Sequence, residues 1–150
     1  MNHLTYFLID DDADDTLLFQ DVLAELELPI RFNSAINGLD ALKRLRKEHG
    51  NLPDVIFLDL NMPVMDGKEC LAHLKADPQL SHVPVIMYTT SSQSKDIEET
   101  LMSGAVCFIT KPTSLKALRE ILVAIARSLP HNLEKTLRQL SDNTNTYIVI

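Results

Sequence analysis

Short apolar runs alternate along this chain with longer segments in which apolar residues recur at helical spacing. Short runs rich in β-branched and aromatic residues and bounded by turn residues are typical of buried strands, whereas apolar residues three and four apart predict amphipathic helices. The pattern predicts strands at 4–9, 30–36, 54–59, 83–89 and 105–110. It predicts helices at about 13–27, 38–48, 67–76, 95–103 and 114–129.

The first predicted helix has an apolar face and a capping residue at its start. Its apolar residues on one face, expected to point inward, are Leu17, Leu18, Val22 and Leu26. Asp12 stands just before it, where a carboxylate accepts free backbone N–H groups and the helix dipole favours negative charge. We therefore expect Asp12 to cap this helix, as Ser114 does for the last one.

Strand and helix alternate five times, which predicts an α/β fold with a parallel sheet, right-handed crossovers and helices on both faces. The runs at 54–59, 83–89 and 105–110 are apolar almost throughout, as expected for strands covered on both sides. A length of 150 residues suits a single domain. We assign that domain to residues 1–129 and treat 130–150 as a C-terminal extension.

The C-terminal extension begins at Pro130, which ends the last predicted helix. Residues 131–140 predict a short helix, and 147–150 form an apolar, β-prone end. The segment is too short to fold as a separate DNA-binding domain. Two interpretations stay open: a frayed terminus, or a docking or dimerisation arm whose apolar end adds to a sheet edge or groove.

Composition and charge limit the classes of function. Hydrophobic residues make up 45% and charged residues 23%, as in ordinary soluble proteins. The net charge is −7, with much of the acidity in 10–15 and no basic stripe, which argues against nucleic acid and favours metal ions or cationic partners. The sequence shows no secretory segment and no apolar run of membrane length. Cys70 and Cys107 are expected to be reduced, buried thiols of a cytoplasmic protein.

The candidate chemistry lies where the predicted strands end. Asp59 closes the most apolar strand, where a carboxylate needs either a function or a local capping role. Asp10 and Asp11 follow the first strand, Thr89 ends the fourth, and Lys111 follows the fifth. Open parallel sheets bind ligands at the carboxyl ends of their strands. If the strand order is 2-1-3-4-5, these side chains converge in one crevice.

Carboxylates gathered in one crevice repel one another unless a cation is present. Mg²⁺ prefers oxygen ligands and keeps several waters, so Asp11, Asp59 and the backbone carbonyl of Asn61 are candidate ligands, with Asp10 binding through water. Lys111 is a point charge suited to phosphate, and the Thr89 hydroxyl can donate to the same oxygens. The set predicts phosphoryl transfer to the Asp59 carboxylate.

Four sequence blocks in this order resemble the signature of two-component response-regulator receiver domains of the CheY type. They are Ile9–Asp11, Leu58–Gly67, Tyr88–Thr90 and Thr110–Pro112. The resemblance spans about residues 4–128 and is specific because the four blocks occur together. It implies a flavodoxin-like, doubly wound (βα)5 sheet with strand order 2-1-3-4-5.

The resemblance also implies a role for each matching residue. It assigns phosphorylation to Asp59 and Mg²⁺ binding to Asp10, Asp11, Asp59 and Asn61. The phosphate-binding and switch positions are Thr89, Thr90, Phe108, Lys111 and Pro112. Phe108 stands where Tyr is commoner, which removes a hydroxyl from the switch. The resemblance further implies a cis peptide bond between Lys111 and Pro112.

The implied function is that of a single-domain response regulator rather than a turnover enzyme. Its partners would be a sensor histidine kinase or phosphotransfer protein and a downstream protein, contacted through the face of helix 95–103, strand 105–110 and the last helix. A homodimer is left open.

The acidic run and the residues 89–92 resemble regulators associated with phytochrome-type kinases. The alternative is a constitutive docking or scaffold module. A Mg²⁺-dependent phosphatase would require a second Asp two residues after Asp59, where this chain has Asn61.

Overall fold

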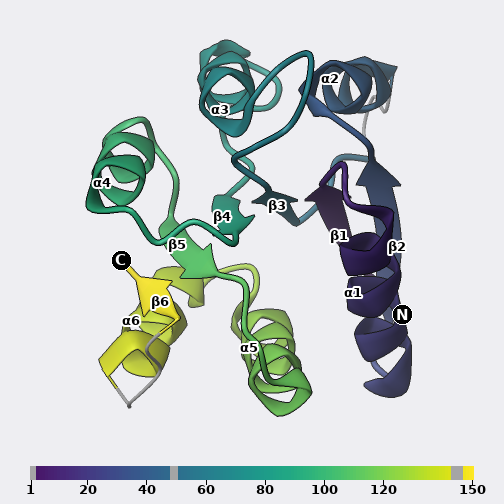
Figure 1. Ribbon diagram of the computed structural model, residues 1–150. Helices are drawn as coiled ribbons and strands as arrows, with labels where there is room; N and C mark the ends of the chain where they lie inside the picture. The colour runs from purple at the N-terminus through teal and green to yellow at the C-terminus, as the bar shows by residue number, and fades with distance from the viewer. Residues whose placement is uncertain (1–2, 48–50, 143–146) are drawn as a thin grey trace.

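The computed structural model describes residues 3–47, 51–142 and 147–150, and over these residues a sheet runs between two layers of helices (Figure 1). The strand order is β2-β1-β3-β4-β5-β6. The strands are β1 (Leu4–Ile9), β2 (Ile30–Ala35), β3 (Val55–Leu58), β4 (Val85–Thr89), β5 (Cys107–Thr110) and β6 (Ile148–Val149). The first five are parallel, which confirms the expected flavodoxin-like order, while β6 joins the edge antiparallel to β5.

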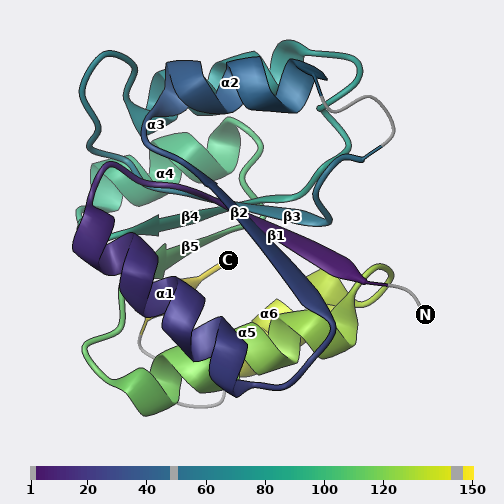
Figure 2. The ribbon, with the colours of Figure 1, turned by 90° about the vertical axis from the view of Figure 1, so that its right-hand side faces the viewer.

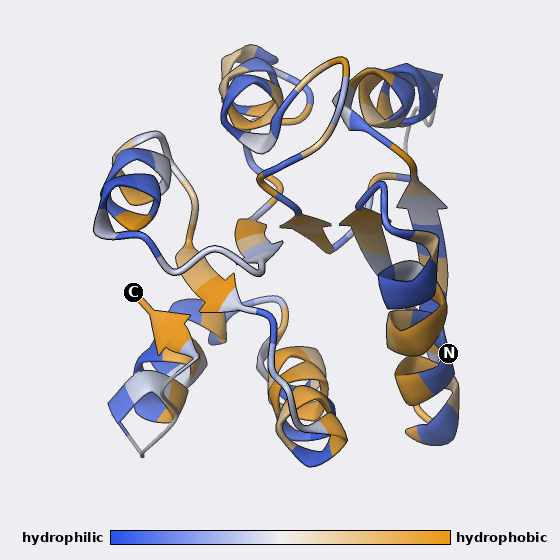
Figure 3. Ribbon diagram, viewed as in Figure 1, coloured by the Kyte–Doolittle hydropathy of each residue, from blue (hydrophilic) through white to orange (hydrophobic). Residues whose placement is uncertain are grey.

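The helices are α1 (Ala13–Glu25), α2 (Gly38–Lys47), α3 (Gly67–Ala76), α4 (Ser94–Met102), α5 (Leu115–Ser128) and α6 (Leu133–Asp142). The predicted end of the second helix, at about residue 48, lies outside the described residues. Helices α2, α3 and α4 lie on one side of the sheet, and α1, α5 and α6 on the other (Figures 1 and 2). Each layer turns an apolar side toward the sheet (Figure 3), so the core forms two clusters separated by the strands. No helix in the described part of the chain has the length and apolar character needed to span a membrane.

The core side of α1 differs from the prediction. Its buried residues are Phe19, Val22 and Leu23. Leu17 and Leu18 are 58% and 42% exposed, so their predicted inward position is wrong. The Phe19 ring packs edge-on against Phe57 at 5.0 Å and Tyr88 at 5.5 Å. Aromatic packing of this kind fixes the rotation of the helix more strongly than two leucines at its start.

The C-terminal extension is folded onto the rest of the chain. Leu133 and Leu137 of α6 are buried in the same core cluster as residues of α5. In β6, Ile148 pairs with Ile109, and the Thr110 N–H donates to the Tyr147 carbonyl at 2.9 Å. Of the two interpretations, the frayed terminus is therefore wrong for 147–150, and this apolar segment adds to the edge of the chain's own sheet.

Candidate functional site

Adjacent strands bring the two buried carboxylates together. Strand β1 lies beside β3 with Ile9 opposite Leu58, so Asp10 and Asp59 leave the sheet side by side. The Asp59 N–H donates to the Ile9 carbonyl at 2.9 Å, which fixes this register. Carboxylate oxygens of Asp10, Asp11 and Asp59 lie within 4.8 Å of one another. The structure thus assembles the predicted acidic cluster.

Lys111 reaches the cluster from the end of β5. Its backbone N–H donates to the Thr89 carbonyl at 2.7 Å, which ties the end of β5 to the end of β4. Its ammonium lies 2.7 Å from Asp10 Oδ2, 2.7 Å from Asp15 Oδ2 and 3.9 Å from Asp59 Oδ2. The side chain is only 10% exposed. Lys111 therefore lies among carboxylates, as predicted, but Asp15 was not expected among its partners.

The turn between β1 and α1 is held by Asp12. Its side chain accepts the N–H groups of Asp14 at 2.9 Å and Asp15 at 3.1 Å, which confirms the predicted helix cap. Its own N–H donates to Asp10 Oδ1 at 2.9 Å. These bonds start α1 directly after the acidic pair, so that Asp15 in the first helical turn points back to the strand ends. No local pattern in the sequence distinguishes Asp15 from the other aspartates of 10–15 as a partner of Lys111.

Burial and charge shift the pKa values at the site. Burial raises the pKa of Asp10 from its ordinary 3.8 to about 6; hydrogen bonds from Lys111 and Asp12 oppose this rise, and the charge of Asp59 adds to it. Burial alone would lower the pKa of Lys111, but its bonds to Asp10 and Asp15 outweigh it and raise that pKa above the usual value. Lys111 is therefore firmly charged, while the charged form of the Asp10 carboxylate would be stabilised by a bound cation.

The donor atoms fit a hard divalent cation. The cluster offers carboxylate oxygens and no sulfur or imidazole ligand. Asp11 is exposed and Asp10 and Asp59 are buried, so the cluster lies at the surface with one side open to water. This arrangement suits Mg²⁺, which binds through one or two carboxylates and keeps several waters. Asn61, exposed in the loop between β3 and α3, follows Asp59 by two residues.

The remaining predicted site residues lie at several depths. Thr89 is fully buried at the end of β4, and Thr90, the next residue, is exposed. Phe108 is fully buried in the core cluster on the side of the sheet that carries α2, α3 and α4. Lys111 and Pro112 are joined by a trans peptide bond; within the described residues the cis bond is Leu129–Pro130. The implied cis bond is thus wrong here, where the trans isomer, favoured by about 0.5–1 kcal/mol, already lets the lysine reach Asp10.

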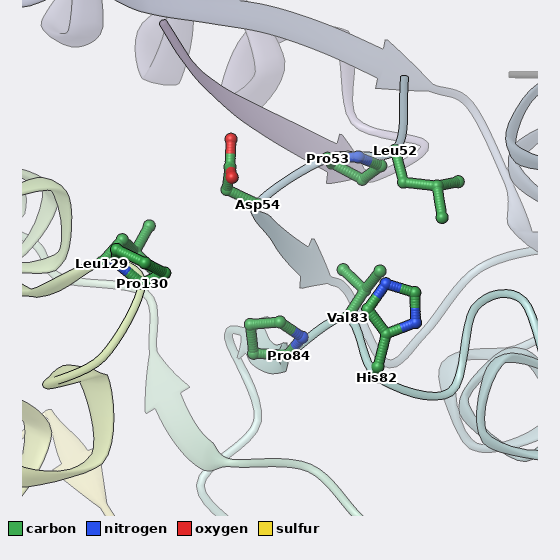
Figure 4. A pocket seen from close by; sticks show the side chains of 8 residues that line it. All are labelled: Leu52, Pro53, Asp54, His82, Val83, Pro84, Leu129 and Pro130. Atoms are coloured by element: carbon green, nitrogen blue, oxygen red, sulfur yellow. The ribbon is translucent and has the colours of Figure 1, made fainter. Parts of the chain in front are cut away.

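A cavity of about 490 Å³ lies at the opposite end of the sheet (Figure 4). It is lined by Leu52, Pro53, Asp54, His82, Val83, Pro84, Leu129 and Pro130. These residues precede β3 and β4 or follow α5, so the cavity opens at the amino ends of the strands. The Asp54 carboxylate there accepts the Thr5 N–H at 2.7 Å and supports β1. This cavity is separate from the acidic cluster.

Comparisons of the sequence and of the structure with known proteins point to the same family. The family model described as "Response regulator receiver domain" matches residues 6–123. Response regulator Rcp1 of Synechocystis sp. is 33% identical over 122 residues, covering 79% of this chain and 83% of that protein. The crystal structure of the phosphorylated cyanobacterial phytochrome response regulator RcpA superposes with a TM-score of 0.76 at 36% identity, covering 85% and 94% of the two chains. The Mn²⁺-bound form of Rcp1 gives 0.73 at 32% identity, covering 84% and 93%.

Proposed function

The chain belongs to the response regulator receiver domain family, and we propose that Asp59 accepts a phosphoryl group from a phosphohistidine. The donor would be a sensor histidine kinase or a phosphotransfer protein. One observation carries the proposal: Asp59, at the end of β3, lies beside both the acidic pair after β1 and the ammonium of Lys111 after β5. This arrangement supplies a nucleophile, ligands for a cation and a counter-charge for phosphate in one place.

The geometry of Asp59 suggests which oxygen reacts. Oδ1 accepts the N–H of Leu60 at 2.8 Å, while Oδ2 faces Lys111. In the proposed step Oδ2 attacks phosphorus, the P–O bond forms, and the P–N bond breaks. The electron pair of that bond goes to the imidazole nitrogen of the donor. Lys111 then closes the remaining distance to the phosphoryl oxygens and offsets their charge.

Mg²⁺, when bound by Asp10, Asp11, Asp59 and the Asn61 carbonyl, would add positive charge against the phosphoryl oxygens. The Thr89 hydroxyl lies at the end of β4, next to β3, where it would donate to the same group. We propose that Thr90, Phe108 and Pro112 shift in position when the Thr89 hydroxyl binds the phosphoryl group. Within the described residues the Thr89 hydroxyl accepts one hydrogen bond, from the Ser91 N–H at 3.5 Å. A bond of this length is weak and easily broken.

Phosphorylation would add about −1.5 to −2 charges to this crevice and shift the population of forms that bind a downstream protein. The surface proposed for that partner includes α4, β5 and α5. Because β6 covers the outer edge of β5, a partner at this edge would meet β6 rather than β5. The likeness to RcpA, a cyanobacterial phytochrome response regulator, supports a phytochrome-type kinase as the donor. We propose the cytoplasm as the place of action.

The test is direct. The full chain is incubated with Mg²⁺ and acetyl phosphate, and its intact mass is measured. We expect a gain of one phosphoryl group that requires Mg²⁺ and disappears in Asp59→Asn. Asp54→Asn, which changes a carboxylate at the far end of the sheet, should be phosphorylated like the unmodified chain. A chain that folds, binds Mg²⁺ and never gains the mass would instead be a constitutive docking module.

A further inference from the structure

We infer that Asp15 is a positioning residue, which holds the Lys111 ammonium beside α1 and off the Asp59 carboxylate. Asp15 and Lys111 form an ion pair at 2.7 Å, although 96 positions separate them in the sequence. Asp15 is no member of the cation cluster formed by Asp10, Asp11 and Asp59. Its carboxylate is partly exposed, at 35%, whereas Lys111 is 10% exposed. The contact therefore joins the helix surface to the interior of the site.

Without Asp15, Lys111 would have two close acidic partners, Asp10 and Asp59. Both are candidate ligands of the cation, so a lysine paired with both would compete with the cation for their oxygens. Asp15 offers a third partner outside that set. Its attraction explains why Nζ lies 2.7 Å from Asp10 and Asp15 but 3.9 Å from Asp59.

The ion pair also orients the ammonium. A lysine ammonium has three N–H donors and no acceptor. Asp10 and Asp15 each take one, which leaves the third toward Asp59 Oδ2. The Tyr88 ring, 5.7 Å from Nζ, lines another side of the ammonium. Asp15 thus fixes both the distance and the direction from which Lys111 would meet a phosphoryl oxygen. Only this last statement rests on the proposed function; the effect on cation binding does not.

Asp15→Asn tests the inference, and Asp14→Asn is its matched control. Both changes remove one negative charge from the first turn of α1, but Asp14 is exposed and has no bond to Lys111 among the described contacts. Mn²⁺ alone is titrated into each chain and followed by its electron paramagnetic resonance. We expect Asp15→Asn to weaken Mn²⁺ binding about fivefold more than Asp14→Asn does. Equal effects of the two variants would overturn the inference.

A double-mutant comparison separates positioning from simple loss of charge. In a Lys111→Met background the excess effect of Asp15→Asn should vanish, because no ammonium is left to release. An excess that persists there would also overturn the inference. The ¹⁵N resonance of the Lys111 ammonium gives an independent readout, in case Lys111→Met does not fold. It should move in Asp15→Asn and stay in place in Asp14→Asn. A chain that never accepts phosphate would still give these results, so failure of the proposed function is distinguishable.

Discussion

Gly67, the first residue of α3, lies directly against the backbone of Asp59. A Cβ at residue 67 would stand 2.3 Å from the Asp59 carbonyl oxygen and 2.7 Å from the Cα of Leu60. The Gly67 N–H donates to the Leu60 carbonyl at 2.7 Å. Asp66 caps α3 by accepting the Glu69 N–H at 2.9 Å, as expected of a turn and helix start. The helix therefore begins on the backbone of the residue that carries the proposed chemistry.

Gly67→Ala should destabilise the fold by about 3 kcal/mol or more, since the atoms it would meet are backbone and cannot turn away. Urea unfolding followed by circular dichroism measures the change. Gly38→Ala is the control, because its added Cβ would meet the flexible side chain of Met65 at 2.8 Å. It should cost clearly less. A Gly67→Ala chain as stable as the Gly38→Ala chain would contradict the close approach seen here.

The sequence was sufficient for the features that depend on local pattern. Apolar runs and turn residues located the strands, and the carboxyl ends of parallel strands made Asp10, Asp59 and Lys111 neighbours. The Asp15–Lys111 pair was missed, since its partners come from elements far apart in the chain and nothing local distinguishes Asp15 from the other aspartates. The rotation of α1 was missed because it is decided by the Phe19 ring in the tertiary core.

Docking of the extension onto the chain's own sheet was also beyond the pattern. The apolar, β-prone residues 147–150 predict a strand but not which edge it joins, and a partner's sheet or the chain's own sheet would satisfy this pattern equally. The free edge of β5 and the apolar side of α6 decide the outcome together. Both exist only once the rest of the chain has folded.

Cation binding should weaken as pH falls through about 6. Asp10 has a pKa of about 6 in the cation-free protein, so below that pH a cation must displace a proton from it. We expect the affinity for Mn²⁺ to be nearly constant above about pH 7. Below about pH 6 it should fall by up to about tenfold for each pH unit. Titrations across this range measure it. Asp10→Asn should bind more weakly and lose this pH dependence near 6; an unchanged affinity down to about pH 5 would contradict the prediction.

The same shift predicts how stability varies with pH. The folded-state pKa of Asp10 lies above its ordinary 3.8, so the protonated form favours the fold. Its contribution to the free energy of unfolding is fully present below about 3.8 and is lost as pH rises through about 6. Urea unfolding without divalent cations should therefore show this loss in the unmodified chain, about 3 kcal/mol, and not in Asp10→Asn. Added Mg²⁺ should restore stability above pH 6.

Val64 carries backbone strain at the edge of the site. Its φ is 71°, in the left-handed region that β-branched residues rarely adopt, and its side chain is 77% exposed. Val64→Asn should raise the free energy of unfolding by about 1 kcal/mol, because Asn tolerates this conformation and little packing is lost. Met102→Asn is the control, since Met102 is 84% exposed without a positive φ. Equal changes in the two variants would mean that Val64 is not strained.

The C-terminal extension should contribute to the stability of the whole domain. Leu137 is fully buried, so Leu137→Ala should lower the free energy of unfolding by about 2–5 kcal/mol in a single cooperative transition. Val149, 39% exposed on the paired strand, is the control, and Val149→Ala should cost much less. Amide exchange at Thr110 reports the same contact locally, because its N–H donates to the Tyr147 carbonyl. Exchange there should speed up in Leu137→Ala more than in Val149→Ala. A detached extension would leave both stability and the Thr110 amide unaffected by Leu137→Ala, and the edge of β5 next to Lys111 would then be open to partners.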